Sequence, residues 1–275
     1  MAGKTCIVTG ATAGIGEALA LGLARQHASL ALVGRDEGRL TTVAAECERL
    51  GSPAVQTYKC DFAVLDEVRD LGVSLLDDLS RIDVLVNNAG LVVQKRAETV
   101  DGYELILQVN QLAPYLLTRL LLDRLVSSAP ARIVWTASDS HEFGPLTPDD
   151  WMSTRGFKPL KVYGRSKLAN ILATAELARR LEGTGVTANC FHPGFVSTSI
   201  GRDHPLGVVF LKLMRPFIKS PAQGADTGVF LATADVPQNG QYFYKRKVHG
   251  TKNDALDPTL GARVWDDCAE LVGLS

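Results

Sequence analysis

The chain alternates short runs of apolar, often β-branched residues with longer segments of helical period. The strand-like runs lie at 5–8, 30–33, 55–59, 84–86, 132–136 and 186–191, and helical patterns lie at 17–26, 38–50, 65–79, 103–127 and 163–181. Apolar strands need cover on both faces, and helical crossovers between parallel strands supply it. We therefore predict an α/β fold in which a doubly wound parallel sheet of about seven strands carries helices on both faces.

No linker, low-complexity segment or internal repeat divides the 275 residues. We therefore predict one domain over residues 1–275, with long loops near 141–160 and 199–222. Loops beyond the carboxyl ends of strands usually cover the ligand in such folds, which makes both loops candidate substrate walls. The net charge is −1 and the two signs are interspersed, so the chain lacks the basic stripe that a nucleic-acid partner would need.

Cysteine usage and the first residues bear on the cellular compartment. The five cysteines are scattered and form no C-x-x-C pair, which argues against a disulfide framework or a zinc site. The first apolar run starts too early to leave room for a signal peptide, and no uncharged apolar run reaches the roughly 18 residues that a bilayer span needs. No histidine lies at metal-ligand spacing from another His, Cys or carboxylate, so we expect no metal and only structural hydrogen bonds at His141 and His192. We expect a cytoplasmic protein.

A glycine-rich run, Thr9 to Gly16, stands between the first strand and the first helix. Gly10 permits a tight turn, Gly14 permits close approach of a pyrophosphate, and Gly16 permits close packing of helix on strand. The helix N-terminus adds free N–H groups and the positive end of the helix dipole. A glycine triplet alone is also compatible with an ordinary turn, but the order of strand, glycines and helix favours a dinucleotide site.

The end of the second strand indicates which dinucleotide is bound. An NAD enzyme ordinarily has an Asp or Glu there for the ribose hydroxyl, whereas this chain has Gly34 followed by Arg35. The small residue leaves room for a 2′-phosphate, and Arg35, with Arg39 one helical turn later, offers guanidinium groups to pair with it. We therefore predict NADP(H) over NAD(H). The alternative is that Arg35 is an ordinary loop cation and that Asp36 binds the ribose.

Tyr163 and Lys167 are four residues apart in a helical pattern, so they share one helix face, about 6 Å apart along the axis. A phenol has a reference pKa of about 10, and a nearby ammonium lowers it toward neutrality, where the phenol can exchange a proton with a substrate. The spacing therefore predicts an acid/base pair. Taken singly, it fits a solvated pair on a helix surface better, and its weight comes from the motifs that accompany it.

Several motifs occur together and in a fixed order along nearly the whole chain. They are the glycine run 9–16, Asn87-Asn88-Ala89-Gly90, Asn110, Ser138, Tyr163 with Lys167, and Pro193-Gly194. Jointly they resemble the short-chain dehydrogenase/reductase family, in which one Rossmann-like domain binds NAD(P). The resemblance implies that Tyr163 is the general acid/base and that Ser138 polarises the substrate oxygen. It also implies that Lys167 holds the nicotinamide ribose and that Asn110 anchors a water of the proton relay.

The same resemblance, with the two arginines, implies a cofactor site. Within it, Asp61 resembles the adenine contact, residues 87–90 line the adenosine side, and Thr198 resembles the carboxamide contact. The full set is Gly10, Thr12, Gly14, Ile15, Gly16, Arg35, Arg39, Asp61, Phe62, Asn87, Ala89, Gly90, Tyr163, Lys167, Pro193, Gly194 and Thr198.

Within the family, Gly34-Arg35-Asp36, His141 after Ser138, and the segments 220–225 and 240–243 resemble the retinol dehydrogenase-like branch. We therefore expect an oxidoreductase acting on an apolar aldehyde, ketone or alcohol, and family habit implies a homo-oligomer. A rival function is a dinucleotide-binding sensor or regulatory protein without turnover. The retained Ser138, Tyr163 and Lys167 argue against it, because a pure binder needs no acid/base pair.

Residues 208–219 place apolar side chains on one helical side and Lys212, Arg215 and Lys219 on another. This pattern is typical of a basic amphipathic helix. Three roles stay open for it: a substrate lid, a helix packed on the domain, and a peripheral contact with a membrane surface.

Overall fold

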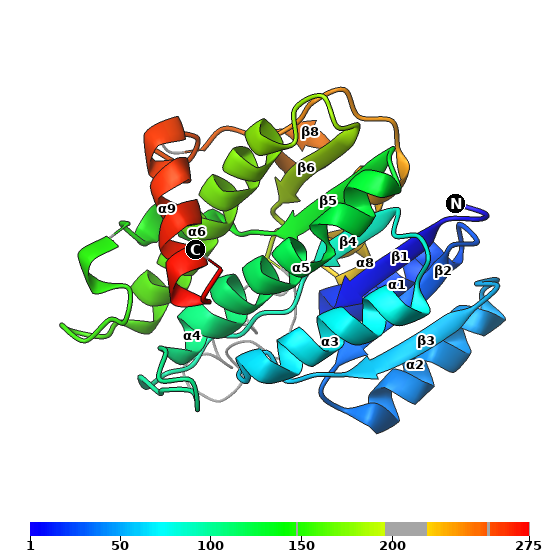
Figure 1. The fold of residues 1–275 in the computed structure, drawn as a ribbon, viewed down its shortest axis with the longest axis horizontal. Helices are drawn as coiled ribbons and strands as arrows, with labels where there is room; N and C mark the ends of the chain where they lie inside the picture. Colours follow the sequence, from blue (N-terminus) through cyan, green and yellow to red (C-terminus); the bar gives the residue numbers. More distant parts are fainter. Residues whose placement is uncertain (147, 196–218, 252–253, 275) are drawn as a thin grey trace.

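The computed structural model describes residues 1–146, 148–195, 219–251 and 254–274, and within them eight strands form one sheet (Figure 1). The strands are β1 (Thr5–Thr9), β2 (Ser29–Gly34), β3 (Val55–Lys59), β4 (Val84–Asn87), β5 (Ala131–Thr136), β6 (Val186–Phe191), β7 (Tyr242–Tyr244) and β8 (Lys247–Val248). Their spatial order is β3-β2-β1-β4-β5-β6-β7-β8. The chain order reverses between β1 and β4, which makes a doubly wound sheet and places the topological switch point there. The predicted fold class is confirmed.

Neighbouring strands from β3 to β7 pair in parallel, and β8 pairs antiparallel with β7. The described sheet therefore has one strand more than the predicted seven or so. The two-residue β8 was missed because so short a run shows no alternation that a sequence pattern could detect.

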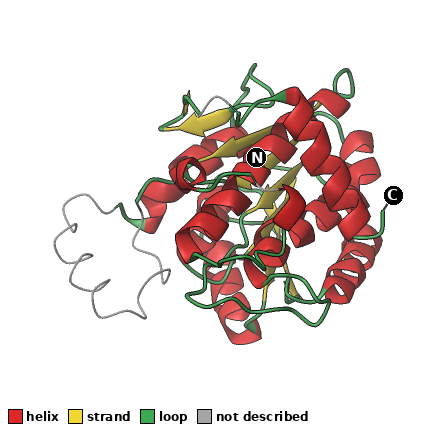
Figure 2. Ribbon diagram, turned by 90° about the vertical axis from the view of Figure 1, so that its left-hand side faces the viewer, coloured by secondary structure: helices red, strands yellow, loops and turns green. Residues whose placement is uncertain are grey.

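Helices cover both faces of the sheet, as Figure 2 shows in a view turned by 90° about the vertical axis from that of Figure 1. The helices are α1 (Gly14–Ala24), α2 (Glu37–Arg49), α3 (Leu65–Asp78), α4 (Leu105–Leu107), the π-helix η1 (Gln108–Leu112), α5 (Ala113–Ser127), the 3₁₀ turns η2 (Asp139–Phe143) and η3 (Pro148–Asp150), α6 (Pro159–Arg180), α8 (Pro221–Thr233) and α9 (Pro258–Leu271). One core lies under α1, α2 and α8, and the other lies under α3, α5, α6 and α9.

Alternate side chains of each central strand enter opposite cores. On β1, Cys6 and Val8 join the core under α1, whereas Ile7 joins the core under α5. On β4, Val84 and Leu85 divide in the same way. This period of two explains why these strands read as continuous apolar runs, since each side chain is buried on one face or the other.

Two functional helices begin earlier than their apolar patterns. Helix α1 begins at Gly14, within the glycine run, and α6 begins at Pro159, four residues before Tyr163. A proline fits the first turn of a helix, because its fixed φ is helical and its missing N–H would have no partner there. Tyr163 therefore lies inside a formed helix.

The helical stretch 105–127 is long and apolar enough, by length and composition, to cross a membrane, with a mean hydropathy of 1.2. However, 78% of that stretch is buried inside the protein, as expected of a core helix. Of the amphipathic segment predicted at 208–219, only Lys219 is among the described residues.

The C-terminal helix α9 packs across α6, beside the sheet layer (Figure 1). Trp265 of α9 meets Tyr115 of α5 edge to face at 4.7 Å between ring centres, and Gln111 Nε2 donates to Cys268 Sγ. Neither α8 nor α9 was predicted as a helix. Helix α9 begins at a proline, and its buried residues Val264, Trp265 and Cys268 follow the helical period, so the signal was present in the sequence.

Candidate active site

The carboxyl ends of the parallel strands bring the predicted residues to one edge of the sheet. Strand β1 ends just before Gly10, β2 just before Arg35, β5 two residues before Ser138, and β6 two residues before Pro193. Ligands of doubly wound sheets bind at this edge, near the switch point. The predicted residues in the described ranges therefore come together around it, whereas Thr198 lies outside those ranges.

The glycine run makes a turn that only glycine can make in this packing. Gly10 has φ +66°, and a Cβ there would lie 2.9 Å from Cα of Ala89. A Cβ on Gly16 would lie 2.0 Å from the carbonyl oxygen of Gly10. The N-cap of α1, Ala13, offers no side-chain oxygen to the first helical N–H groups. The turn thus leaves backbone donors at a helix N-terminus, which suits a pyrophosphate.

The segment around Asn87 is joined to this turn through Thr9. The Thr9 hydroxyl oxygen accepts hydrogen bonds from the N–H groups of Asn88 (2.9 Å) and Ala89 (3.1 Å). The Asn88 side-chain amide donates to the Thr9 carbonyl at 3.0 Å. The first and fourth strands therefore present their loops as one surface.

At the end of β2, a Cβ on Gly34 would lie 2.6 Å from Cγ2 of Thr12, so a larger residue there would require the Thr12 side chain to move. The Arg35 and Arg39 side chains are 67% and 66% exposed. Arg35 has a weak contact of 3.9 Å with Asp61. The Asp36 carboxylate accepts from the backbone N–H of Arg39 at 3.0 Å and so caps α2. This use of Asp36 weakens the alternative in which it binds the ribose. Phe62, by contrast, is buried in the core.

Lys167 is buried beneath the edge of the sheet that the carboxyl ends of the parallel strands form. Its ammonium donates to the carbonyl of Thr136 at 2.9 Å and to Oδ1 of Asn170 at 3.3 Å, and it lies 5.7 Å from the centre of the Tyr163 ring. Burial lowers the pKa of Lys167 to about 8. The Lys–Tyr spacing therefore belongs to an internal pair, and the solvated-pair alternative is wrong.

The phenol of Tyr163 behaves differently from the sequence-based expectation. Burial raises its pKa to about 12, and a hydrogen bond with the Ser138 side chain only partly opposes this shift. The expected lowering of this pKa by Lys167 is not seen, because desolvation of the phenolate dominates the shift and the ammonium lies 5.7 Å from the ring centre. The Tyr163 phenol and the Ser138 side chain therefore lie within hydrogen-bonding reach of each other.

A break in the helical pattern frees the backbone of Asn110. Residue 114, four positions on, is a proline without an N–H, and the helix passes through the π-helical turn η1 there. The Asn110 carbonyl accepts instead from Nδ2 of Asn170 at 2.8 Å. The Asn110 side chain donates to Leu91 O and to Ser166 Oγ, both at 3.0 Å. This ties η1 to α6.

Two glycines that the sequence did not single out hold Ser138 against Tyr163. A Cβ on Gly144 would lie 1.9 Å from the backbone nitrogen of Arg165, and a Cβ on Gly164 would lie 2.3 Å from the carbonyl oxygen of Ser140. The turn that follows Ser138 therefore touches the backbone of α6 beside Tyr163. Gly164 sits mid-helix, where glycine is costly, and that cost was the available signal.

The two histidines near Ser138 both make hydrogen bonds. Nδ1 of His141 lies 2.8 Å from the Ser138 carbonyl, and burial lowers the pKa of His141. Nε2 of His192 lies 2.9 Å from Oδ2 of Asp139. The expected structural hydrogen bonds at His141 and His192 are present, and the contact with Asp139 joins residues that are distant in the chain. Among the described residues, no group of three or more His, Cys, Asp or Glu could hold a metal ion.

Gly194 adopts φ +86° just after His192 and Pro193. A Cβ there would lie 2.9 Å from Nζ of Lys219. The same ammonium lies 4.4 Å from the centre of the Tyr244 ring. The Pro193-Gly194 turn is therefore packed against the Lys219 ammonium, which also contacts Tyr244 of β7.

Residues 4–206 match the short chain dehydrogenase family. The chain is 43% identical over 274 residues to a Streptomyces protein provisionally named daunorubicin C-13 ketoreductase DnrU. The match covers 98% of this chain and 93% of that one. It is 37% identical over 294 residues to human retinol dehydrogenase 14, covering 100% and 88%.

Solved structures agree with the fold. A protein of unassigned function from Mycobacterium paratuberculosis has a TM-score of 0.81 at 30% identity, covering 99% of this chain and 94% of that one. The NADP complex of Pseudomonas aeruginosa RhlG has a TM-score of 0.72 at 25% identity, covering 88% and 94%. Family match, relatives and fold agree, and the chain belongs to the short-chain dehydrogenase/reductase family, in its retinol dehydrogenase-like branch.

Proposed function

We propose that this oxidoreductase uses NADP(H) to interconvert an apolar aldehyde or ketone and its alcohol, with Tyr163 as general acid/base. The convergence of Ser138, Tyr163 and Lys167 at the cofactor edge carries the proposal. The bound nicotinamide would supply or accept the hydride. A neutral phenol is the form that donates a proton to a carbonyl oxygen, and the raised pKa of Tyr163 keeps it in that form at neutral pH.

The other side chains support this proton transfer. Ser138, hydrogen-bonded to Tyr163, would orient the substrate oxygen, and Lys167 would hold the nicotinamide ribose while its charge stabilises the phenolate left after proton donation. Asn110, bonded to η1 and α6, would anchor a water that returns the proton. The sensor alternative is not favoured, since its binding function has no use for this constellation.

The preference for NADP(H) rests on the end of β2. Gly34 has no carboxylate to bind a ribose hydroxyl, and the exposed Arg35 and Arg39 offer guanidinium groups to a 2′-phosphate. RhlG, a structural relative, was solved with NADP. The glycine turn suits a pyrophosphate, because Gly10 and Gly16 let the turn fold tightly and the N-terminus of α1 has no side-chain cap.

An apolar substrate is supported by side chains beside the proposed reacting groups. Phe143, at the end of the turn after Ser138, is 58% exposed, and Phe195, after the Pro193-Gly194 turn, is 71% exposed. Both rings are available to pack against an apolar substrate beside the proposed reacting groups. The relatives are named for apolar carbonyl or alcohol substrates, a ketoreductase and a retinol dehydrogenase.

We further propose one cytoplasmic NAD(P)-binding domain that assembles as a homo-oligomer. The buried core helix at 105–127 and the five free, buried cysteines support this location.

The decisive experiment follows absorbance at 340 nm with NADPH and a panel of apolar aldehydes and ketones. We expect substrate-dependent oxidation, and weaker apparent affinity for NADH than for NADPH. Tight NADPH binding without turnover on any carbonyl would support the sensor instead. Equal or better use of NADH would contradict the cofactor assignment.

A further inference from the structure

Asp139 joins the end of β5 to two other strands. It directly follows Ser138, and its Oδ2 lies 2.9 Å from Nε2 of His192, the residue after β6. Its Oδ1 accepts a hydrogen bond of 2.6 Å from the hydroxyl of Tyr242 on β7. The backbone N–H of Asp139 donates to Nδ1 of His192 at 3.3 Å. One residue thus contacts both ring nitrogens of His192 as well as Tyr242.

These contacts define which nitrogen of His192 carries the proton. Nδ1 faces an N–H donor and must offer a lone pair, which leaves the proton on Nε2, facing the carboxylate. The ring is 5% exposed and lies 5.1 Å from the Tyr244 ring, and the backbone N–H of His192 donates to Phe243 O at 2.9 Å. His192 is therefore held in one orientation and one tautomer.

The carboxylate can keep both acceptor roles throughout the neutral range. Burial alone would raise the pKa of Asp139, but hydrogen bonds from His192 and Tyr242 outweigh it and lower the pKa to about 2. Ordinary acidity therefore does not convert an acceptor oxygen into a donor facing Tyr242 or His192.

Both ends of this linkage lead to groups of the proposed site. On one side, Asp139 is the chain neighbour of Ser138, whose Oγ accepts from the Ser140 N–H at 3.1 Å. On the other side, His192 precedes the Pro193-Gly194 turn. A shift of the Asp139–His192 contact would therefore move the Ser138 hydroxyl relative to that turn.

We propose that Asp139 and His192 are positioning residues that hold the Ser138 hydroxyl in register with the Pro193-Gly194 turn. The proposal rests on the function proposed above, since the register matters through the orientation of a substrate carbonyl between Ser138 and the cofactor. Misplacement by about 1 Å can cost up to a hundredfold in rate, so loss of the linkage should lower kcat more than it weakens binding.

The test compares Asp139→Ala with Asp139→Asn in NADPH-dependent carbonyl reduction. Alanine removes both acceptors, and we expect kcat to fall about tenfold or more with the Kd for NADPH within about twofold of wild type. Asparagine can turn its oxygen toward His192 and its amide toward Tyr242, whose hydroxyl can rotate to accept. We therefore expect Asp139→Asn to retain kcat within about threefold.

A double-mutant cycle tests the linkage itself. His192→Asn keeps an acceptor for the Asp139 N–H but loses the donor to the carboxylate. If the two residues act as a unit, Asp139→Ala/His192→Asn loses no more activity than either single change. The matched control is Asp226→Ala: its side chain is 42% exposed against 39% for Asp139, and it too is ion-paired, with Arg246, which follows β7. We expect that control to leave kcat unchanged.

Histidine ¹⁵N NMR of the wild-type protein gives a readout that needs no turnover, and the expected signal for His192 is the Nε2–H tautomer. Four outcomes would each overturn the inference: full kcat in Asp139→Ala, an Asp139→Asn variant as slow as the alanine variant, additive effects of the two single changes, or the Nδ1–H tautomer. In each case, turnover by the wild-type protein would leave the proposed function standing. A wild type inactive on every carbonyl would overturn the function and this inference with it.

Discussion

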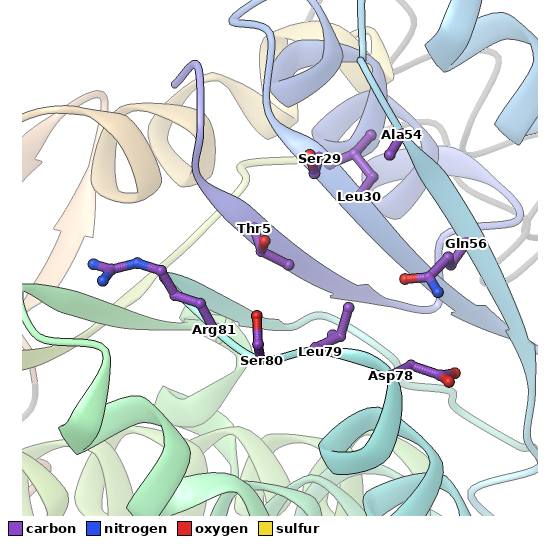
Figure 3. A pocket seen from close by; sticks show the side chains of 9 residues that line it. All are labelled: Thr5, Ser29, Leu30, Ala54, Gln56, Asp78, Leu79, Ser80 and Arg81. Carbon is purple, nitrogen blue, oxygen red and sulfur yellow. The ribbon is translucent and has the colours of Figure 1, made fainter.

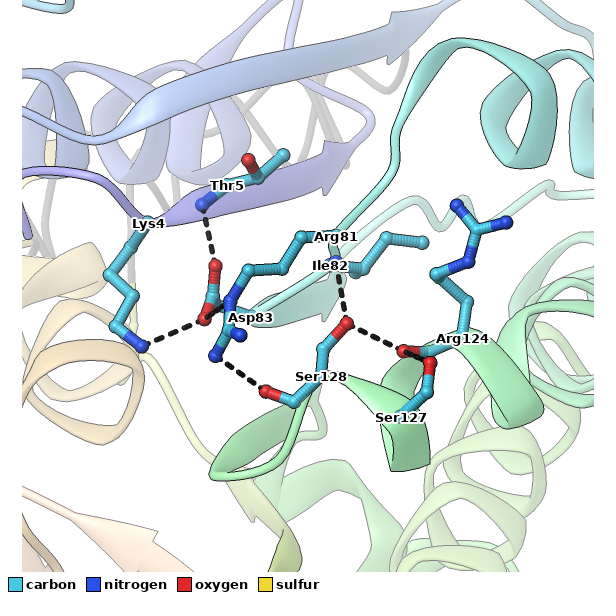
Figure 4. A network of polar contacts seen from close by, with 8 residues as sticks. All are labelled: Lys4, Thr5, Arg81, Ile82, Asp83, Arg124, Ser127 and Ser128. Carbon is cyan, nitrogen blue, oxygen red and sulfur yellow. Dashed lines mark hydrogen bonds and ion pairs between the residues drawn. The ribbon is translucent and has the colours of Figure 1, made fainter.

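One edge of the sheet is formed by the amino ends of the parallel strands and the other by their carboxyl ends, and the buried charges at these two edges have different partners. At the amino edge, Asp83 accepts from Lys4 Nζ (2.9 Å), Arg81 Nε (2.7 Å) and the Thr5 N–H (2.9 Å), as Figure 4 shows. Burial alone would raise the pKa of Asp83, but these bonds lower it below its ordinary value. At the carboxyl edge, the Lys167 ammonium donates to two neutral oxygens, and burial lowers its pKa. The buried charge at the amino edge is paired with charges of opposite sign, whereas the buried ammonium at the carboxyl edge is bonded to neutral oxygens, as is common at functional sites.

The presence of a cavity does not by itself show which edge of the sheet carries the proposed active site. The cavity in Figure 3, of about 180 Å³, lies at the amino edge, lined by residues such as Thr5, Gln56 and Asp78. Its charged groups are already engaged: Asp78 accepts from the Tyr58 hydroxyl at 2.9 Å, and Arg81 bonds Asp83. The proposed reacting groups converge at the other edge, so chemistry and not concavity locates the site.

The most direct test of this comparison makes the same change, tyrosine to phenylalanine, at each edge. Tyr163→Phe removes the proposed proton donor, and we expect kcat to fall about a thousandfold with NADPH binding intact, because general acid catalysis is worth about 10²–10⁴-fold. Tyr58→Phe removes a hydroxyl at the amino edge and should leave kcat within about twofold. Steady-state kinetics and NADPH fluorescence titration measure both. Retained turnover in Tyr163→Phe would end its assignment as acid/base.

Stability should respond with opposite signs at the two edges. Lys167→Met should raise the free energy of unfolding at pH 7 by about 1–3 kcal/mol, because the folded state no longer holds a buried charge. Asp83→Asn should lower it by about 2 kcal/mol, because Lys4 and Arg81 lose their charged partner.

The pH dependence gives the sign check for this pair. The wild-type lysine has a folded pKa of about 8, below its ordinary 10.5, so its penalty is full below pH 8 and fades as the pH rises toward 10.5. The advantage of Lys167→Met should shrink over that range. Urea unfolding at pH 7 and pH 10 measures it, and activity should follow the reverse order, lost in Lys167→Met and kept in Asp83→Asn. A methionine variant less stable than wild type at pH 7 would contradict the buried-charge account.

The comparison also shows what a sequence can reveal. Strand order and the clustering of Gly10, Ser138 and Lys167 at one edge follow from periodicity and motif order, because parallel strands must end together. The direction of the Tyr163 pKa shift could not be predicted, since it depends on how completely packing excludes water from the phenol. The Asp139–His192 contact was missed for a similar reason: the two residues are 53 positions apart, and only the pairing of β5 with β6 brings them together.

The smallest expected effect probes the close backbone contact that joins Ser138 to α6. Gly164→Ala would place a Cβ 2.3 Å from the Ser140 carbonyl oxygen, so the turn after Ser138 must move away. We expect kcat to fall about tenfold and stability to change by about 1 kcal/mol or less, because alanine's helix propensity offsets part of the strain. Gly250→Ala, where the added Cβ meets nothing within 4 Å, is the matched control and should leave both unchanged. If Gly164→Ala keeps wild-type kcat, the carboxyl edge tolerates looser packing than its glycines indicate, and the position of Ser138 must be set by its other contacts.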